Sequence, residues 1–153
     1  PCQLVYMAED SKRAIDPRYA KAGEEVSFAD GYPYLIATTG SLAAIEEERG
    51  KDLDMRRFRP NIVIDHPAAF AEDNWQAITI GNQPFRLPKP CARCVVITID
   101  PDTTVKDPEV FAAVAKLHQN NRKVLFGMNA CWEGIMSGMI RIGDELKVEQ
   151  YRS

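Results

Sequence analysis

The segment with the clearest capacity for chemistry holds two cysteines three residues apart, Cys91 and Cys94, beside the cations Lys89 and Arg93. A thiolate is the form of cysteine that ligates metals and attacks electrophiles, and nearby positive charge stabilises it. The pattern therefore predicts that Lys89 and Arg93 hold one of these sulfurs ionised near neutral pH. This segment is the first candidate for a functional site.

The spacing of the two thiols leaves several interpretations open. A structural zinc site needs four Cys or His ligands, usually in pairs, and the other candidates stand singly in the sequence. A thioredoxin-type redox pair lies between a strand and a helix, whereas this pair precedes a predicted strand over Val95–Ile99. Two half-buried structural cysteines are equally compatible with the spacing. The candidates for further zinc ligands are Cys2, His66, Cys131 and His118.

A second candidate is a cluster of three guanidinium groups, Arg56, Arg57 and Arg59. Arginines bind phosphate or carboxylate groups through paired hydrogen bonds, although a solvated basic loop has the same appearance in a sequence. Arg59 directly precedes a predicted strand, so we expect packed structure to hold its side chain. This position distinguishes Arg59 from an arginine in a solvated basic loop.

Composition bounds the fold and the partners. The chain has 153 residues, of which 45% are hydrophobic and 27% charged, as in a soluble globular domain. Its net charge of −3 offers no basic field for nucleic acid, and no apolar run reaches the roughly 20 residues of a membrane span. Four cysteines are too few for a disulfide scaffold, which favours a reduced, cytoplasmic protein. We expect a single domain over residues 1–153.

The elements that must position these residues are mostly short strands. Helices are predicted from an N-cap at Ser41 to a stop at Gly50, and from Asp107-Pro108 to about Asn120. Many short strands separated by turns favour a β-barrel or sandwich over a parallel sheet flanked by helices. The predicted strands are Leu4–Met7, Glu25–Phe28, Tyr34–Ala37, Asn61–Ile64, Ala77–Ile80, Pro84–Leu87, Cys94–Ile99, Val124–Phe126 and Met139–Val148.

Short motifs in a fixed order give the chain a resemblance to a known family. The chain resembles the MOSC domain, named for the C-terminal region of molybdenum cofactor sulfurase, over about Leu4–Val148. It is most similar to the branch of the mitochondrial amidoxime-reducing component and its bacterial relatives. The motifs begin at Phe28 (Phe-Ala-Asp-Gly-Tyr-Pro-Tyr-Leu-Ile-Ala), Ser41 (Ser-Leu-Ala), Arg57 (Arg-Phe-Arg-Pro-Asn-Ile-Val-Ile), Ala71 (Ala-Glu-Asp-x-Trp), Ile80 (Ile-Gly), Lys89 (Lys-Pro-Cys-x-Arg-Cys), Ile99 (Ile-Asp-Pro-Asp-Thr) and Ile140 (Ile-Arg-Ile-Gly-Asp).

The resemblance implies a mainly β, MOSC-type barrel with a few peripheral helices, and it implies a cofactor. In the family, the second cysteine of the Cys-x-x-Cys pair is a ligand of the molybdenum cofactor, a molybdopterin, which assigns metal ligation and catalysis to Cys94. Soft thiolate ligation suits such a metal. The other positions that match the family's cofactor-binding residues are Gly31, Tyr32, Arg59, Asn61, Ala92, Arg93 and Asn129.

The function implied by the resemblance is a molybdoenzyme that reduces N-hydroxylated small molecules. Its electrons would come from a separate iron–sulfur, flavin or haem protein, and neither nucleic acid nor membrane is an expected partner. One alternative is a sulfur carrier with a persulfide on Cys94, which works with a pyridoxal-phosphate-dependent cysteine desulfurase. Another is a cofactor-free module of a longer protein. We also expect the chain to lack the N-terminal β-region of its relatives.

Overall fold

The computed structural model describes residues 2–15, 17–18, 21, 24–29, 31–135 and 137–152. The chain divides into two compact units, Pro1–Pro33 and Tyr34–Ser153, and each is described by itself. The second unit contains both predicted clusters, the Cys-x-x-Cys segment and the three arginines.

The described part of the first unit has almost no regular structure. One isolated antiparallel bridge joins Ala14 to Glu25, and Ile15 and Val26 beside it are buried. The predicted strand Leu4–Met7 is wrong: this segment is irregular, and Leu4 is 99% exposed. The strand predicted over Glu25–Phe28 is reduced to the bridge at Glu25. A strand forms only where a neighbour pairs its backbone groups, and a short apolar run does not reveal that neighbour.

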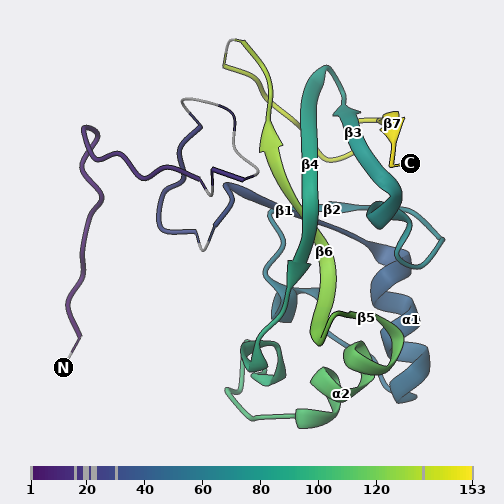
Figure 1. Cartoon of the computed structure of the whole chain (residues 1–153). Helices are drawn as coiled ribbons and strands as arrows, with labels where there is room; N and C mark the ends of the chain where they lie inside the picture. Colours follow the sequence, from purple (N-terminus) through teal and green to yellow (C-terminus); the bar gives the residue numbers. More distant parts are fainter. Residues whose placement is uncertain are drawn as a thin grey trace. The chain divides into compact units, whose positions relative to one another are not determined.

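The second unit is built on one curled, mixed β-sheet (Figure 1). Its pairing order is β2-β1-β6-β4-β3-β7, with β5 paired to β6, and β1 and β2 are parallel whereas the other pairs are antiparallel. The prediction of a mainly β fold with a few peripheral helices is confirmed. The strands are β1 (Tyr34–Thr38), β2 (Ile62–Ile64), β3 (Trp75–Ile80), β4 (Gln83–Ala92), β5 (Gln119–Asn120), β6 (Lys123–Trp132) and β7 (Leu146–Tyr151).

Helices α1 and α2 both contribute to the core at one end of the sheet, together with the 3₁₀ turns η1 and η3. The start of α2 is as predicted, since Asp107 caps the backbone N–H of Glu109 and Pro108 is the first helical residue. The left-handed stop of α1 at Gly50 is also confirmed. The elements are α1 (Thr39–Arg49), α2 (Pro108–Leu117), η1 (Met55–Phe58), η2 (Ala71–Asn74) and η3 (Val95–Thr98).

Other predicted boundaries differ. The N-cap of α1 is Thr38, not Ser41, and α2 ends at Leu117. The chain after α2 turns back through Asn121 and Arg122, both with positive φ, which forms the β5–β6 hairpin. Two consecutive residues with positive φ make the tight turn that suits the twist of paired strands. This hairpin replaces the last helical turn that the sequence pattern suggested.

Two predicted strands near the site are also corrected. In place of the predicted strand Cys94–Ile99, residues Val95–Thr98 form the 3₁₀ turn η3. Exposed Val95 and Val96 are followed by buried Ile97 and Thr98, which is not the alternation of a strand. Of the predicted strand Met139–Val148, only the last three residues belong to β7. By contrast, β4 is longer than predicted and includes Cys91.

The core has two hydrophobic clusters, and adjacent residues of β1 enter different ones. Ala37 packs with α1, α2 and Phe126, whereas Ile36 packs with β3, β4 and Met128. Phe126 and Met128 would share a face in a regular strand. Gly127 between them has φ of 72°, and a Cβ there would lie 2.7 Å from the carbonyl oxygen of Ile36. The glycine therefore lets β6 contribute to both clusters while its backbone approaches β1 closely.

Candidate functional site

The Cys-x-x-Cys segment is the turn that leads from β4 into η3. Cys91 is half-buried at the end of β4, and Cys94 is an exposed residue at the N-cap of η3. The side chain of Cys94 makes no capping hydrogen bond. Exposed Val95 and Val96 follow it. Cys94 is therefore the thiol of this pair that is open to a ligand or substrate.

Arg93 joins the turn to two other segments. Its Nη1 donates to Sγ of Cys91 at 3.1 Å and its Nη2 donates to the carbonyl oxygen of Phe58 at 2.7 Å. Its backbone N–H donates to the carbonyl of Val124 in β6. Of the two sulfurs of the pair, Arg93 therefore contacts that of Cys91. The bond to Phe58 also brings the end of η1, where Arg59 lies, against the cysteine turn.

The three arginines of the predicted basic cluster differ in what they contact. Arg57 has a side chain only 9% exposed and pairs with Asp100 and the carbonyl of Thr98, so it fixes η1 to η3. Arg56 is 61% exposed and pairs with Asp54 and Asp102. Hydrogen bonds from Arg56 lower the pKa of Asp54, and those from Thr103 lower the pKa of Asp100. These two arginines serve the local fold.

Arg59 is the exception within this cluster. It is exposed, with φ of 56°, at the C-cap of η1. The expectation that packed structure holds its side chain is wrong, because the left-handed turn directs the residue to the surface. Among the described residues, its side chain has no hydrogen-bond or ion-pair partner. Arg59 can therefore offer its guanidinium to an anionic ligand beside the cysteine turn.

Asn61 and Asn129 lie in one row across the sheet and bond to backbone groups. The side-chain oxygen of Asn61 accepts from the N–H of Leu35 at 2.8 Å, and the N–H of Asn61 donates to the Leu35 carbonyl at 2.9 Å. Leu35 is paired with Asn129. The amide of Asn129 donates to the carbonyls of Lys89 and Pro90, at 3.4 and 3.2 Å. Both amides therefore hold the segments that carry Arg59 and Cys91.

The remaining predicted site residues fall in two places. Ala92 is exposed at the end of β4, between the two cysteines. Gly31 and Tyr32 belong to the first unit, in which Tyr32 is buried. The structure thus brings Arg59, Ala92, Arg93 and Cys94 to one end of the sheet. It adds the Phe58 carbonyl, which no sequence motif indicated, and it shows that Cys91 is a side-chain partner of Arg93.

The site fits a cofactor that brings most of its own ligands. No group of three or more His, Cys, Asp or Glu side chains within the described residues is arranged to hold a bare metal ion. Cys94 is an exposed sulfur donor, and exposed Arg59 follows Phe58, whose carbonyl is bonded to Arg93 of the same turn. One soft thiolate and one anion-binding group are what a metal already held by an anionic organic ligand needs from a protein.

This fold and this turn define a domain that presents one thiol at the end of a curled β-sheet. The family model of the MOSC domain matches residues 23–147, and the chain belongs to this family. The match includes the cysteine turn, the three arginines and both asparagines of the row. Membership of this family supports a function of this chain that is related to the molybdenum cofactor.

Curated relatives support the same assignment. Over 79% of this chain, the sequence is 33% identical to human mitochondrial amidoxime-reducing component 1. Over 78% of this chain, it is 34% identical to human mitochondrial amidoxime reducing component 2. It is 31% identical to human molybdenum cofactor sulfurase over 84% of its length. The matched regions cover 38%, 38% and 16% of those proteins, so the chain spans well under half of each. Within the described residues, no helix is both long and apolar enough to cross a membrane.

Proposed function

We propose that the chain binds the molybdenum cofactor through Cys94 and takes part in the reduction of N-hydroxylated compounds. The observation that carries this proposal is the exposed thiol of Cys94, which makes no capping hydrogen bond and lies on a turn that Arg93 joins to Phe58, the residue before exposed Arg59. The similarity to amidoxime-reducing components supports the substrate class, amidoximes and related N–O compounds. The electrons would come from a separate donor protein. A cytoplasmic location stays a prediction from the cysteine content.

The residues of the turn would have distinct roles. Cys94 would supply a thiolate ligand, and Arg59 would bind an anionic group of the cofactor through its guanidinium. Arg93 would position the turn, since its guanidinium is already bound to Cys91 and Phe58. Asn61 and Asn129 would keep the flanking segments in place through their backbone bonds. When bound, the cofactor would supply the redox chemistry that breaks the N–O bond of the substrate.

Cofactor content tests this proposal directly. The chain is expressed in a host that makes the molybdenum cofactor, and molybdenum and pterin are quantified in wild type, Cys94→Ser and Cys91→Ser. We expect both components in wild type and Cys91→Ser and neither in Cys94→Ser. Benzamidoxime reduction with a chemical electron donor then tests the reaction. Retention of molybdenum by Cys94→Ser with its loss from Cys91→Ser would overturn the ligand assignment.

A sulfur carrier is the second candidate, favoured by the exposed Cys94 thiol and by the similarity to molybdenum cofactor sulfurase. In this case a cysteine desulfurase would transfer one sulfur atom to Cys94 as a persulfide. Incubation with a pyridoxal-phosphate-dependent desulfurase and cysteine should then add the mass of one sulfur to wild type and not to Cys94→Ser. Neither cofactor nor persulfide on any form would indicate a cofactor-free module of a longer protein.

A further inference from the structure

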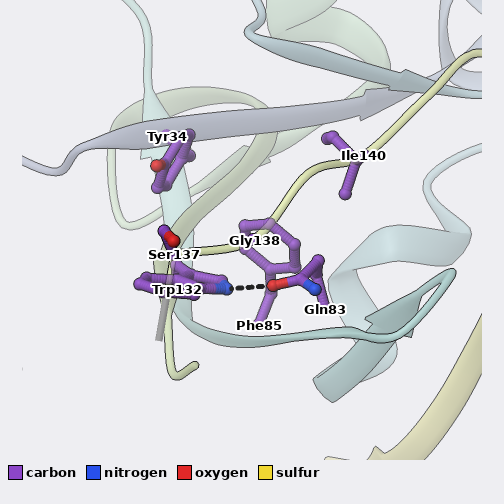
Figure 2. A pocket seen from close by; sticks show the side chains of 7 residues that line it. All are labelled: Tyr34, Gln83, Phe85, Trp132, Ser137, Gly138 and Ile140. Carbon is purple, nitrogen blue, oxygen red and sulfur yellow. Dashed lines mark hydrogen bonds between the residues drawn. The ribbon is translucent and has the colours of Figure 1, made fainter. Parts of the chain in front are cut away.

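A cavity of about 280 Å³, whose lining side chains are drawn in Figure 2, lies near the start of β4. The cysteine turn is at the other end of this strand. The cavity lining includes three aromatic side chains, from β1, β4 and β6. Gln83 and Phe85 are at the start of β4, whereas Cys91 is near its end. Phe85 and Cys91 are six positions apart along the strand, which corresponds to about 20 Å. The cavity is therefore distinct from the proposed cofactor site. It is lined by Tyr34, Gln83, Phe85, Trp132, Ser137, Gly138 and Ile140.

The aromatic walls of this cavity are fixed by contacts within the protein. The ring of Tyr34 meets that of Phe85 edge to face, with centroids 5.6 Å apart. The indole N–H of Trp132 donates to Oε1 of Gln83 at 3.0 Å, shown by the dashed line in Figure 2. Because the indole can only donate, this bond also sets the orientation of the Gln83 amide. The amide nitrogen then faces away from the indole and donates to Asn82.

Two glycines after β6, Gly134 and Gly138, pack closely on Trp132 and Gln83 of the lining. A Cβ at Gly138 would lie 1.8 Å from Oε1 of Gln83, and one at Gly134 would lie 2.0 Å from the ring of Trp132. The backbone at both positions therefore packs directly on the residues that line the cavity. The Gln83 side chain would have to move if Gly138 carried even a methyl group. This close approach makes the cavity sensitive to a very small substitution.

The chemistry of the lining defines the kind of ligand. None of the seven residues carries a charge near neutral pH, so the cavity disfavours an ion. The three aromatic rings favour contact with another ring, and the Gln83 amide and Ser137 hydroxyl can bond to a polar group at its edge. The volume is just below the range of roughly 300–1,000 Å³ of pockets for drug-sized ligands. It suits a molecule of one or two rings.

We propose that this cavity binds a small, uncharged aromatic compound that carries an amide-like polar group. The site rests on Tyr34, Phe85 and Trp132 as ring contacts, and on Gln83 and Ser137 as hydrogen-bond partners. It is independent of the reaction proposed for Cys94. Its location beside the β3–β4 hairpin places a ligand away from the thiol, so the bound compound is an accessory ligand rather than a reactant at Cys94.

Benzamide is a suitable probe, and the indole N–H resonance of Trp132 reports its binding. The chain has two tryptophans, and Trp75 is 2% exposed and outside the cavity, so Trp75→Phe assigns the two signals. We expect saturable shifts of the Trp132 signal with a Kd on the order of 1 mM, as suits a ligand of about nine non-hydrogen atoms. Cyclohexanecarboxamide, which has the same polar group without the aromatic ring, should bind at least roughly fivefold more weakly.

Gly138→Ala provides the structural test, with Ile142→Ala as the matched control in the same segment. Ile142 is fully exposed and does not line this cavity. We expect Gly138→Ala to weaken benzamide binding by roughly tenfold or more and Ile142→Ala to leave it unchanged. Shifts confined to the Trp75 signal, equal binding of both probes, or unchanged affinity in a folded Gly138→Ala protein would each overturn the proposal.

Discussion

Arg93 donates an N–H from Nη1 to Sγ of Cys91 over 3.1 Å, so the cation within the Cys-x-x-Cys turn faces the first sulfur and not the second. The other terminal nitrogen of the same guanidinium is bound to the carbonyl of Phe58. The two thiols are thereby distinguished: one belongs to a fixed polar contact, and the other is presented to solvent. Arg93 is adjacent to Cys94 in the sequence, yet its side chain binds Cys91.

Replacement of Arg93 by methionine should destabilise the fold through the loss of both contacts. The buried Phe58 carbonyl would lose its donor, and an unsatisfied polar group of this kind costs about 1–3 kcal/mol. We expect the free energy of unfolding, measured by urea denaturation, to fall by about 2 kcal/mol. Arg141→Met is the control, because Arg141 is exposed and its hydrogen bond to Asp144 is donated by its backbone N–H, which the substitution keeps. An equal, small effect of both substitutions would contradict the positioning role of Arg93.

Alanine substitutions of Arg57 and Arg59 should have different effects: the first should lower fold stability, and the second should lower cofactor binding. Arg57→Ala removes a mostly buried ion pair with Asp100 and a bond to Thr98, and we expect a loss of about 3 kcal/mol in unfolding free energy. Arg59→Ala should change stability by less than about 0.5 kcal/mol, since the side chain is exposed. In a host that makes the cofactor, Arg59→Ala should nevertheless carry less pterin than wild type. Full pterin content in Arg59→Ala would remove Arg59 from the proposed site.

The sequence predicted the elements that carry local signals. Asp107 followed by Pro108 defined the start of α2, and Gly50 defined the end of α1, because each signal acts through its own backbone. The Cys-x-x-Cys segment and Arg59 were also found by residue type and spacing. Their grouping at one end of the sheet agrees with the family resemblance.

The parts that the sequence did not predict depend on long-range contacts. The run Cys94–Ile99 is rich in β-branched residues, yet it forms η3, where Arg57 from a distant segment binds the Thr98 carbonyl. Ser41 looked like a helix cap, but its hydroxyl is bound to Glu72, which is thirty-one positions away. Such partners are brought together only by the fold, so no local pattern reports them.

Glu72 should be one of the most sensitive polar positions of the chain. It is fully buried, and its carboxylate accepts hydrogen bonds from the hydroxyls of Thr38 and Ser41 at the start of α1. Glu72→Ala leaves both hydroxyls without this acceptor, and we expect unfolding free energy to fall by about 3 kcal/mol. Glu72→Gln keeps one carbonyl oxygen and should lose less. Exposed Glu145 provides a control substitution, Glu145→Ala, whose effect should stay below about 0.5 kcal/mol.

His118 should make stability depend on pH. Its Nε2 lies 2.6 Å from Oδ2 of Asp73 in η2, and its Nδ1 lies 3.1 Å from the carbonyl oxygen of Leu125 in β6. Both neighbours are acceptors, so this geometry requires a proton on each ring nitrogen. Burial lowers the pKa of His118, but the hydrogen bond and charge of Asp73, with the Leu125 carbonyl and the nearby charge of Glu72, raise it overall.

Because the folded-state pKa of His118 lies above its unfolded value of about 6.5, the imidazolium contributes stability in full below about pH 6.5. That contribution is lost as pH rises through the folded-state pKa. We therefore expect the unfolding free energy of wild type to fall above pH 6.5 more steeply than that of His118→Gln. NMR titration of the two histidines checks the origin, with His66→Gln to assign the signals. A His118 signal that titrates below pH 6.5, or parallel stability profiles for wild type and His118→Gln, would contradict this account.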